Sequence, residues 1–273
     1  METRAVRIGL SVWSGLVVLF LWIPLAVIAA YAFNSSQIQS WPISSWTFHW
    51  FRVAWNSPDV RSALWLSVQV ALIATAIALV LGSMAAFGVH RFRFFGRDSV
   101  SLLLLLPIAL PGIITGLALQ QFFTFASQRV SWLPGVPFSM MTIVIGHATF
   151  CVVVVYNNVL ARLRRTSTSL VEASMDLGAD GWQTLRYVTL PMAATALISG
   201  ALLAFALSFD EVIVTTFTAG AQTTLPIFIL NNINRGTQLP VINVVAFVVI
   251  LLTVIPVWAS VRLTHTSGLS RRN

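Results

Sequence analysis

Two adjacent carboxylates in an apolar stretch are the residues of this chain whose types and spacing best suit chemistry. Asp210 and Glu211 lie in a predicted membrane span, where an ionised side chain costs at least about 2.5 to 3.5 kcal/mol and therefore normally faces a cavity or a partner. Carboxylates can replace the lost hydration of an organic cation, and Phe209 and Phe217 can each add about 0.5 to 2 kcal/mol of cation–π attraction. We interpret these four residues as a substrate pathway for a cation.

This hypothesis treats the stretch as one unbroken helix. In such a helix Asp210 and Phe217, seven residues apart, share a face, and Phe209 and Glu211 flank it. The alternative is structural, with the carboxylates forming an interhelical ion pair or capping a helix at a break in the span. No arginine is predicted inside another span, which weakens the ion-pair version unless a partner subunit supplies one.

Residues for other kinds of chemistry are sparse. One cysteine, Cys151, and four scattered histidines give no metal-ligand spacing, so no metal site is expected. His147 is interpreted as a hydrogen-bonded core residue in preference to a proton relay. Lysine is absent, and with it any Gly-rich phosphate-binding motif, so a separate chain must bind and hydrolyse ATP if ATP is used. We assign no catalytic residue and no cofactor.

The polar stretch from Arg162 to Pro191 is the second candidate site because it is long, mixed in charge and organised. Two pairs have the capping-box spacing that begins a helix: Ser169 with Glu172, and Asp180 with Gln183. Gly178 offers a turn between these helices, and Leu190 with Pro191 is expected to stop the second one. Two short helices joined by a glycine would form a compact knob, which is a natural handle for a soluble protein.

The elements that carry these sites are predicted to be membrane helices. Hydrophobic residues make up 57% of the chain, charged residues only 9%, and the mean hydropathy is +0.85. A hydrocarbon core of about 30 Å needs about 20 apolar residues, and backbone groups in lipid must bond within a helix. Six stretches qualify, the first being too long for a cleaved signal sequence: Leu10–Phe33, Ala63–Val89, Val100–Phe125, Met140–Ala161, Met192–Ala219 and Val241–Val261.

Arginine predicts the orientation of these spans. All sixteen basic residues are Arg, and the net charge is +8. With both termini in the cytoplasm, only Arg52, Arg61, Arg129 and Arg235 lie outside, which fits the preference of basic residues for the inner side. The charge is therefore explained by membrane topology and anionic lipid, and a nucleic-acid partner is not expected. Trp46 and Trp50 predict a short interfacial helix near Ser45–Trp55.

The loop has a recognisable pattern. It reads Glu172, Ala173, Ser174, three residues, Gly178, nine residues, Val188, Thr189, Leu190, Pro191. This resembles the cytoplasmic signature loop of binding-protein-dependent ABC importer permeases, Glu-Ala-Ala, three residues, Gly, nine residues, Ile, any residue, Leu-Pro. Ser174 and Val188 depart from that pattern by small changes in volume. The resemblance implies that Glu172, Ala173, Ser174, Gly178, Leu190 and Pro191 couple the chain to an ATPase subunit.

The likeness extends over nearly the full chain. Several segments resemble the second permease subunit of spermidine/putrescine importers: Phe33–Ser35, Leu106–Ile113, Gly146–Phe150 and Ala201–Pro226. The resemblance implies an all-α membrane protein with six transmembrane helices and type I ABC importer permease architecture. It also implies a multi-pass protein of the cell inner membrane that transports a polyamine with a second permease subunit, two ATPase subunits and an external solute-binding protein.

The expected organisation is a cytoplasmic N-terminus at residues 1–9, a permease domain at 10–263 containing the coupling loop 162–191, and a cytoplasmic tail at 264–273. Three other functions stay open. An ABC permease could carry another amine compound, iron, an oxyanion or thiamine, although anions fit poorly beside two carboxylates. An ion-coupled secondary transporter could use Asp210, Glu211 and His147 as a relay. A membrane enzyme is the most distant alternative.

Overall fold

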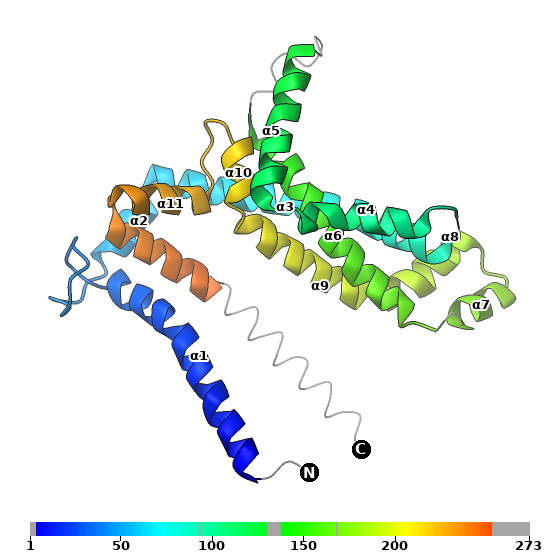
Figure 1. Cartoon of the computed structure of the whole chain (residues 1–273), viewed down its shortest axis with the longest axis horizontal. Helices are drawn as coiled ribbons and strands as arrows, with labels where there is room; N and C mark the ends of the chain where they lie inside the picture. The colour runs from blue at the N-terminus through cyan, green and yellow to red at the C-terminus, as the bar shows by residue number, and fades with distance from the viewer. Residues whose placement is uncertain (1–3, 93, 130–137, 168, 253–273) are drawn as a thin grey trace. The chain divides into compact units, whose positions relative to one another are not determined.

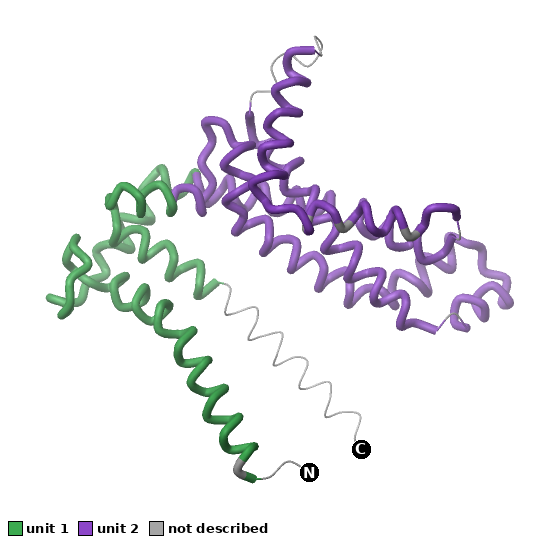
Figure 2. The backbone as a smooth tube through the Cα atoms, in the orientation of Figure 1, with its two compact units in different colours: residues 1–62, 229–273 green, residues 63–228 purple. Residues whose placement is uncertain are grey.

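The structure, a computed structural model, describes residues 4–92, 94–129, 138–167 and 169–252 (Figure 1). These residues form helices and no named strand, which confirms the predicted all-α class. The backbone divides into two compact units, residues 1–62 with 229–273 (unit 1) and residues 63–228 (unit 2), which are considered separately (Figure 2). The predicted tail at 264–273 lies outside the described residues.

Unit 1 contains α1 (Arg4–Ala32), α2 (His49–Asn56) and an apolar helix at Leu239–Leu252. Four of its aromatic rings contact one another with centroids 5.0 to 6.2 Å apart, although none of them is buried: Phe33, Phe48, Phe51 and Phe247. The predicted interfacial helix begins later than expected, at His49. Trp46 lies before it in a β-bridge with Asn34, and Trp50 Nε1 donates to the Asn34 carbonyl oxygen at 3.0 Å.

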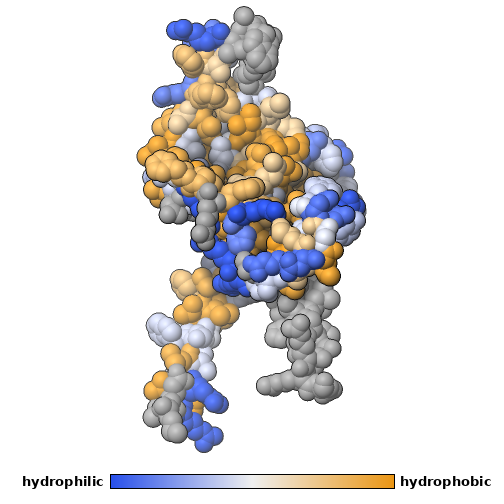
Figure 3. All heavy atoms as spheres, turned by 90° about the vertical axis from the view of Figure 1, so that its right-hand side faces the viewer, coloured by the Kyte–Doolittle hydropathy of each residue, from blue (hydrophilic) through white to orange (hydrophobic). Residues whose placement is uncertain are grey.

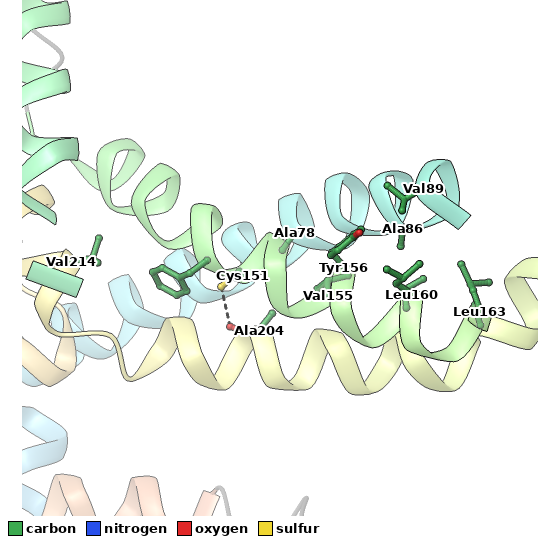
Figure 4. Close-up of a cluster of buried hydrophobic side chains, with 13 residues drawn as sticks. Ala78, Ala86, Val89, Cys151, Val155, Tyr156, Leu160, Leu163, Ala204 and Val214 are labelled. Carbon is green, nitrogen blue, oxygen red and sulfur yellow. Dashed lines mark hydrogen bonds between the residues drawn. The ribbon is translucent and has the colours of Figure 1, made fainter. Parts of the chain in front are cut away.

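Unit 2 is built around α6 (Met140–Arg164), which carries fourteen buried residues. It packs on α9 (Leu190–Phe209) and α3 (Pro58–Arg91, whose first turn belongs to unit 1). Small residues allow this close approach, since a Cβ added to Gly82 would lie 2.7 Å from the Val152 carbonyl oxygen. The core is a continuous cluster along α6, shown in Figure 4.

Four helices are long and apolar enough to cross a membrane: Val6–Ala32, Pro58–Arg91, Met140–Arg164 and Gly181–Phe209. They confirm the first, second and fourth predicted spans and the greater part of the fifth. The sixth is represented by Leu239–Leu252, and its remaining predicted residues, 253–261, lie outside the described part.

The third predicted span is two helices instead of one. The helix α4 (Arg97–Ala109) ends before Pro111, and α5 (Gly112–Arg129) leaves at a steep angle (Figure 1). Proline has no N–H and disfavours helical backbone at the residue before it, and Leu110 is accordingly extended, with φ −79° and ψ 142°. Pro107 lies within α4, so the bend between the two helices is at Pro111.

The fifth predicted span is also broken. The helix α9 ends at Phe209, and the short helix α10 (Ile213–Thr218) begins after three residues that include both carboxylates. α10 is followed by α11 (Leu225–Arg235), which crosses the boundary between the units.

Candidate functional site

The loop between α6 and α9 forms the predicted knob. It contains α7 (Ser169–Asp176), α8 (Gly181–Thr184) and a π-helical turn η1 (Leu185–Thr189). Gly178 joins the two helices with a φ of +86°, a left-handed conformation that suits glycine. Its N–H donates to Met175 O at 2.9 Å and that of Ala179 to Ser174 O at 3.0 Å, which is a Schellman ending for α7.

One of the two predicted capping boxes forms. The Gln183 N–H donates to Asp180 Oδ1 at 2.8 Å, and the Asp180 N–H donates to Gln183 Oε1 at 2.9 Å. The box predicted for Ser169 and Glu172 is wrong. Ser169 already lies within α7, and its N–H donates to Ser167 Oγ at 3.2 Å. Glu172 is therefore exposed instead of being engaged in the cap.

Ser174, a departure from the family pattern, ties the knob together. Its hydroxyl lies 3.0 Å from Thr184 Oγ1, so the side chains of α7 and α8 are in direct hydrogen-bond contact. Thr184 is fully buried. No sequence pattern predicted this pair, because the two residues lie in different helices and belong to no local motif.

The knob exposes several large apolar side chains among polar ones. No residue of α7 is buried, and Leu177 is 90% exposed. Trp182 and Tyr187 are also exposed. Figure 3 looks onto this end of unit 2 and shows hydrophilic residues gathered around it. Large apolar side chains on a polar segment mark a protein contact more often than a solvated surface.

A crevice of about 320 Å³ lies behind the knob. Glu172 lines it together with His90 and Arg91 from the end of α3. The remaining lining comes mainly from the ends of α6, α7 and α9, so the crevice separates the knob from the helix bundle of unit 2. The knob thus has open space on its inner side, into which it could move.

The second helix of the knob runs directly into α9, contrary to the predicted stop at Leu190 and Pro191. One helix extends from Gly181 to Phe209. Pro191 is accommodated by the π-turn η1 just before it, where the Leu190 N–H donates to Leu185 O. A wider turn avoids the clash between a proline ring and the preceding carbonyl groups. At about 1.5 Å per residue this helix is about 43 Å long.

The far end of this helix carries the two carboxylates. Asp210 and Glu211 line a groove of about 580 Å³ with Leu203, Ala206, Leu207 and Val154. Asp210 is exposed, and its N–H donates to Ala206 O at 3.2 Å, closing the last turn of α9. The charged side chains that line this groove are both acidic.

Glu211 also caps a helix, as the structural alternative to a substrate pathway predicted. Its Oε1 accepts a hydrogen bond of 2.9 Å from the Val214 N–H in the first turn of α10. A carboxylate at a helix N-terminus satisfies a free donor and is favoured by the helix dipole. Because only Oε1 is bonded to the backbone, Glu211 lines the groove while it caps α10.

The two phenylalanines do not join the groove. Since the helix breaks at Asp210, the predicted common face of Asp210 and Phe217 does not exist. Phe217 packs on α5 instead, where a Cβ added to Gly116 would lie 2.5 Å from its ring. Phe209 stacks on Phe205 with ring centroids 6.0 Å apart. Gly116 has no side chain and therefore allows this close approach.

His147 lies beside the break and was predicted as a bonded core residue. It is 1% exposed, with Nδ1 2.8 Å from Ser208 Oγ on α9 and Nε2 2.8 Å from Thr215 Oγ1 on α10. Its burial and its two bonds agree with that prediction. Its partners could not be predicted because they depend on the break. Among the described residues no group of three or more His, Cys, Asp or Glu could hold a metal ion.

Comparison with known proteins gives a consistent assignment. PotI of Escherichia coli, a putrescine transport system permease protein, is 35% identical over 234 residues, which cover 85% of this chain and 82% of PotI. PotC of Haemophilus influenzae, a spermidine/putrescine transport system permease protein, is 30% identical over 251 residues, which cover 91% of this chain and 93% of PotC. The sulfate transport system permease protein CysW of E. coli is 35% identical over 56% of this chain.

The fold is shared with a solved structure. The crystal structure of a bacterial ABC transporter involved in the import of the acidic polysaccharide alginate covers 96% of this chain and 98% of its own, with a TM-score of 0.68 and 16% identity. Residues 78–263 match the family of binding-protein-dependent transport system inner membrane components. Together with the relatives aligned along most of its length, this match shows that the chain belongs to that family.

Proposed function

We propose that this chain is one of two permease subunits forming the pathway of an ATP-driven polyamine importer, with both termini in the cytoplasm. The observation that carries the substrate assignment is the groove lined by Asp210 and Glu211, whose charged lining residues are both acidic. Two carboxylates beside aliphatic side chains suit a flexible chain with ammonium groups at its ends. The relatives PotI and PotC support the same class of solute.

The knob formed by α7, Gly178 and α8 is the proposed contact with an ATPase subunit. Its support is the exposed apolar surface of α7 and α8, which no described part of the chain covers. Glu172, Ala173, Ser174, Gly178, Leu190 and Pro191 keep the roles that the signature pattern implies. Since the chain has no lysine and no phosphate-binding motif, two copies of a separate ATPase would hydrolyse ATP.

The continuous helix from Gly181 to Phe209 gives this contact a mechanical route to the substrate. Closure of the ATPase subunits would displace the knob, and a single helix would carry that displacement to the groove at Asp210. The paired permeases would then alternate access to the two sides of the membrane. An external solute-binding protein would deliver the polyamine to the outer side.

A double variant tests the substrate assignment. Asp210→Asn with Glu211→Gln removes both charges, while the glutamine Oε1 can still accept from the Val214 N–H and preserve the cap. Because a hydrogen bond to a charged group contributes about 1.5 to 3 kcal/mol, uptake of subsaturating putrescine should fall about tenfold or more in proteoliposomes containing the complete transporter.

Asp59→Asn is the matched control, because Asp59 is an exposed carboxylate in the first turn of α3, outside the groove. Uptake in this variant should remain normal. Normal putrescine uptake in the double variant would refute the polyamine pathway, and a gain in uptake of an anion such as sulfate would favour a permease for an oxyanion.

A further inference from the structure

The break between α9 and α10 is spanned by one buried side chain, His147 of α6. Its two ring nitrogens bond Ser208, in the last turn of α9, and Thr215 in α10, each at 2.8 Å. Ser208 is 2% exposed and Thr215 0%. We call these three residues the His147 bridge. A buried network in which every member is bonded holds one geometry, because any displacement leaves a polar group without a partner.

The hydrogen positions follow from the partners. Thr215 Oγ1 lies 2.7 Å from the Glu211 carbonyl oxygen and donates its only hydrogen to it. Thr215 must then accept from the Nε2–H of His147, and a neutral imidazole accepts from the Ser208 hydroxyl at Nδ1. The bridge therefore extends from α9, through His147 and Thr215, to the backbone of Glu211 itself.

The helix on the far side of the break is anchored to the bundle. Thr142 Oγ1 donates to the Thr218 carbonyl oxygen at 2.7 Å, and a Cβ added to Gly146 would lie 3.0 Å from Val214 Cγ1. Phe217 packs against Gly116 of α5. α10 is thus held by α5 and α6, whereas α9 is continuous with the knob.

We infer that His147 is a positioning residue that links the end of α9 to the Asp210–Glu211 segment, so that displacement of the knob changes the groove. This inference rests on the proposed function. The three residues of the break carry both carboxylates, and their positions are set by the helix ends on either side. Without the bridge, α9 could move while α10 and the Glu211 cap stay in place.

The test measures ATP hydrolysed per putrescine imported by the complete transporter in proteoliposomes. Each bridge residue is changed singly by His147→Gln, Ser208→Ala or Thr215→Val. Each change should raise this ratio about fivefold, the factor that corresponds to the loss of one net hydrogen bond. Double variants should be no worse than single ones, because residues acting as one unit are not additive. Ser208→Thr, which keeps the hydroxyl, should preserve the normal ratio.

Cys151→Ala is the matched control. Cys151 lies one turn further along α6, is fully buried, and contacts α9 through a 3.4 Å bond from Sγ to the Ala204 carbonyl oxygen (Figure 4). It does not cross the break, so its loss should leave the ratio unchanged. An equal rise in Cys151→Ala would mean that general packing between α6 and α9 is responsible, and the inference would be overturned.

An unchanged ratio in Ser208→Ala and Thr215→Val transporters would also overturn it, even if His147→Gln failed to assemble, because both variants retain the imidazole. The outcome is separable from that of the proposed pathway. Asp210→Asn should lower uptake of subsaturating putrescine, whereas the bridge variants should waste ATP. Normal uptake in Asp210→Asn together with a raised ratio in the bridge variants would refute the pathway and retain the bridge.

Discussion

At the scale of residues, both candidate sites depend on a few side-chain hydrogen bonds, some between neighbours in the chain and some between separate helices. The Asp180–Gln183 capping box was predicted from spacing and confirmed, because both partners lie in one helical turn. The contacts of His147 and Ser174 join residues far apart in the chain or in different helices. Spacing in the sequence says nothing about such pairs until the helices are placed. Glu211 shows a third case, in which the capping alternative and the groove coexist in one side chain.

The Ser174–Thr184 contact predicts the local stability of the knob. Ser174→Ala leaves the buried Thr184 hydroxyl without this partner, and the net loss of one hydrogen bond is about 1 kcal/mol. Amide hydrogen exchange across residues 177–185 should therefore accelerate about fivefold. Ser169→Ala is the control, since Ser169 is an exposed serine of the same helix whose hydroxyl contacts Ser167 and not α8 among the described residues. Equal exchange in both variants would show that the contact contributes nothing.

At the scale of elements, hydropathy predicted where helices lie and missed where they break. Apolar residues continue through Leu110 and Pro111, and they resume at Val212 directly after the two carboxylates, so both stretches look like single spans. The first break coincides with Pro111, because proline disfavours helical backbone at the residue before it. The second break has only the two carboxylates, whose capping role was recognised as an alternative. The π-turn before Pro191 replaced a predicted helix end, because a wider turn accommodates a proline that an α-helix interior would not.

Replacing Gly178 tests whether transport depends on the left-handed turn of the knob. An alanine there would adopt a φ of +86° at a cost of about 1 to 2 kcal/mol, although its Cβ would meet no atom within 4 Å. Gly178→Ala should lower ATP-driven uptake while the chain still inserts into the membrane. Gly181→Ala adds the same methyl group three residues later without a positive φ and should transport normally. Normal uptake by Gly178→Ala would remove the turn from the coupling route.

Replacing Pro191 tests whether uptake per ATP depends on the π-turn η1. Pro191→Ala restores a backbone donor and allows η1 to become α-helical, which changes the rotation of α8 relative to α9 by up to about 100°. Uptake per ATP should fall. Pro58→Ala is the control, because Pro58 is the first residue of α3, where a proline removes no helical hydrogen bond. This variant should have little effect on uptake per ATP. An unchanged ratio in Pro191→Ala would mean that the orientation of the knob does not depend on this turn.

At the scale of the whole molecule, composition and Arg distribution predicted a multi-pass membrane protein, and family membership agrees with that prediction. The partners of this chain cannot be predicted from its own packing. Their binding sites appear in a single chain only as exposed surfaces that the rest of the chain does not cover. The exposed apolar residues of the knob and the carboxylate groove are two such faces. The signature pattern, and not the hydrophobic periodicity, predicted that the knob contacts an ATPase.

The proposed topology makes a direct prediction. Cys151 is fully buried, so Cys151→Ala gives a background without native cysteine. Leu177→Cys places a thiol at a 90% exposed position in the knob, and Trp41→Cys places one at a 79% exposed position in the first outer loop. A membrane-impermeant maleimide should label Leu177→Cys only in inside-out vesicles and Trp41→Cys only in right-side-out vesicles. The opposite pattern would invert the topology and place the knob out of reach of a cytoplasmic ATPase.

The proposed function requires this chain to act as the driven half of an ATP-powered assembly. The most direct measurement is uptake of labelled putrescine into proteoliposomes that contain either this chain alone or the chain with the second permease, the ATPase and the loaded binding protein. We expect uptake only in the complete assembly and only with ATP on the side of the knob. Saturable uptake by the chain alone under an ion gradient would contradict it.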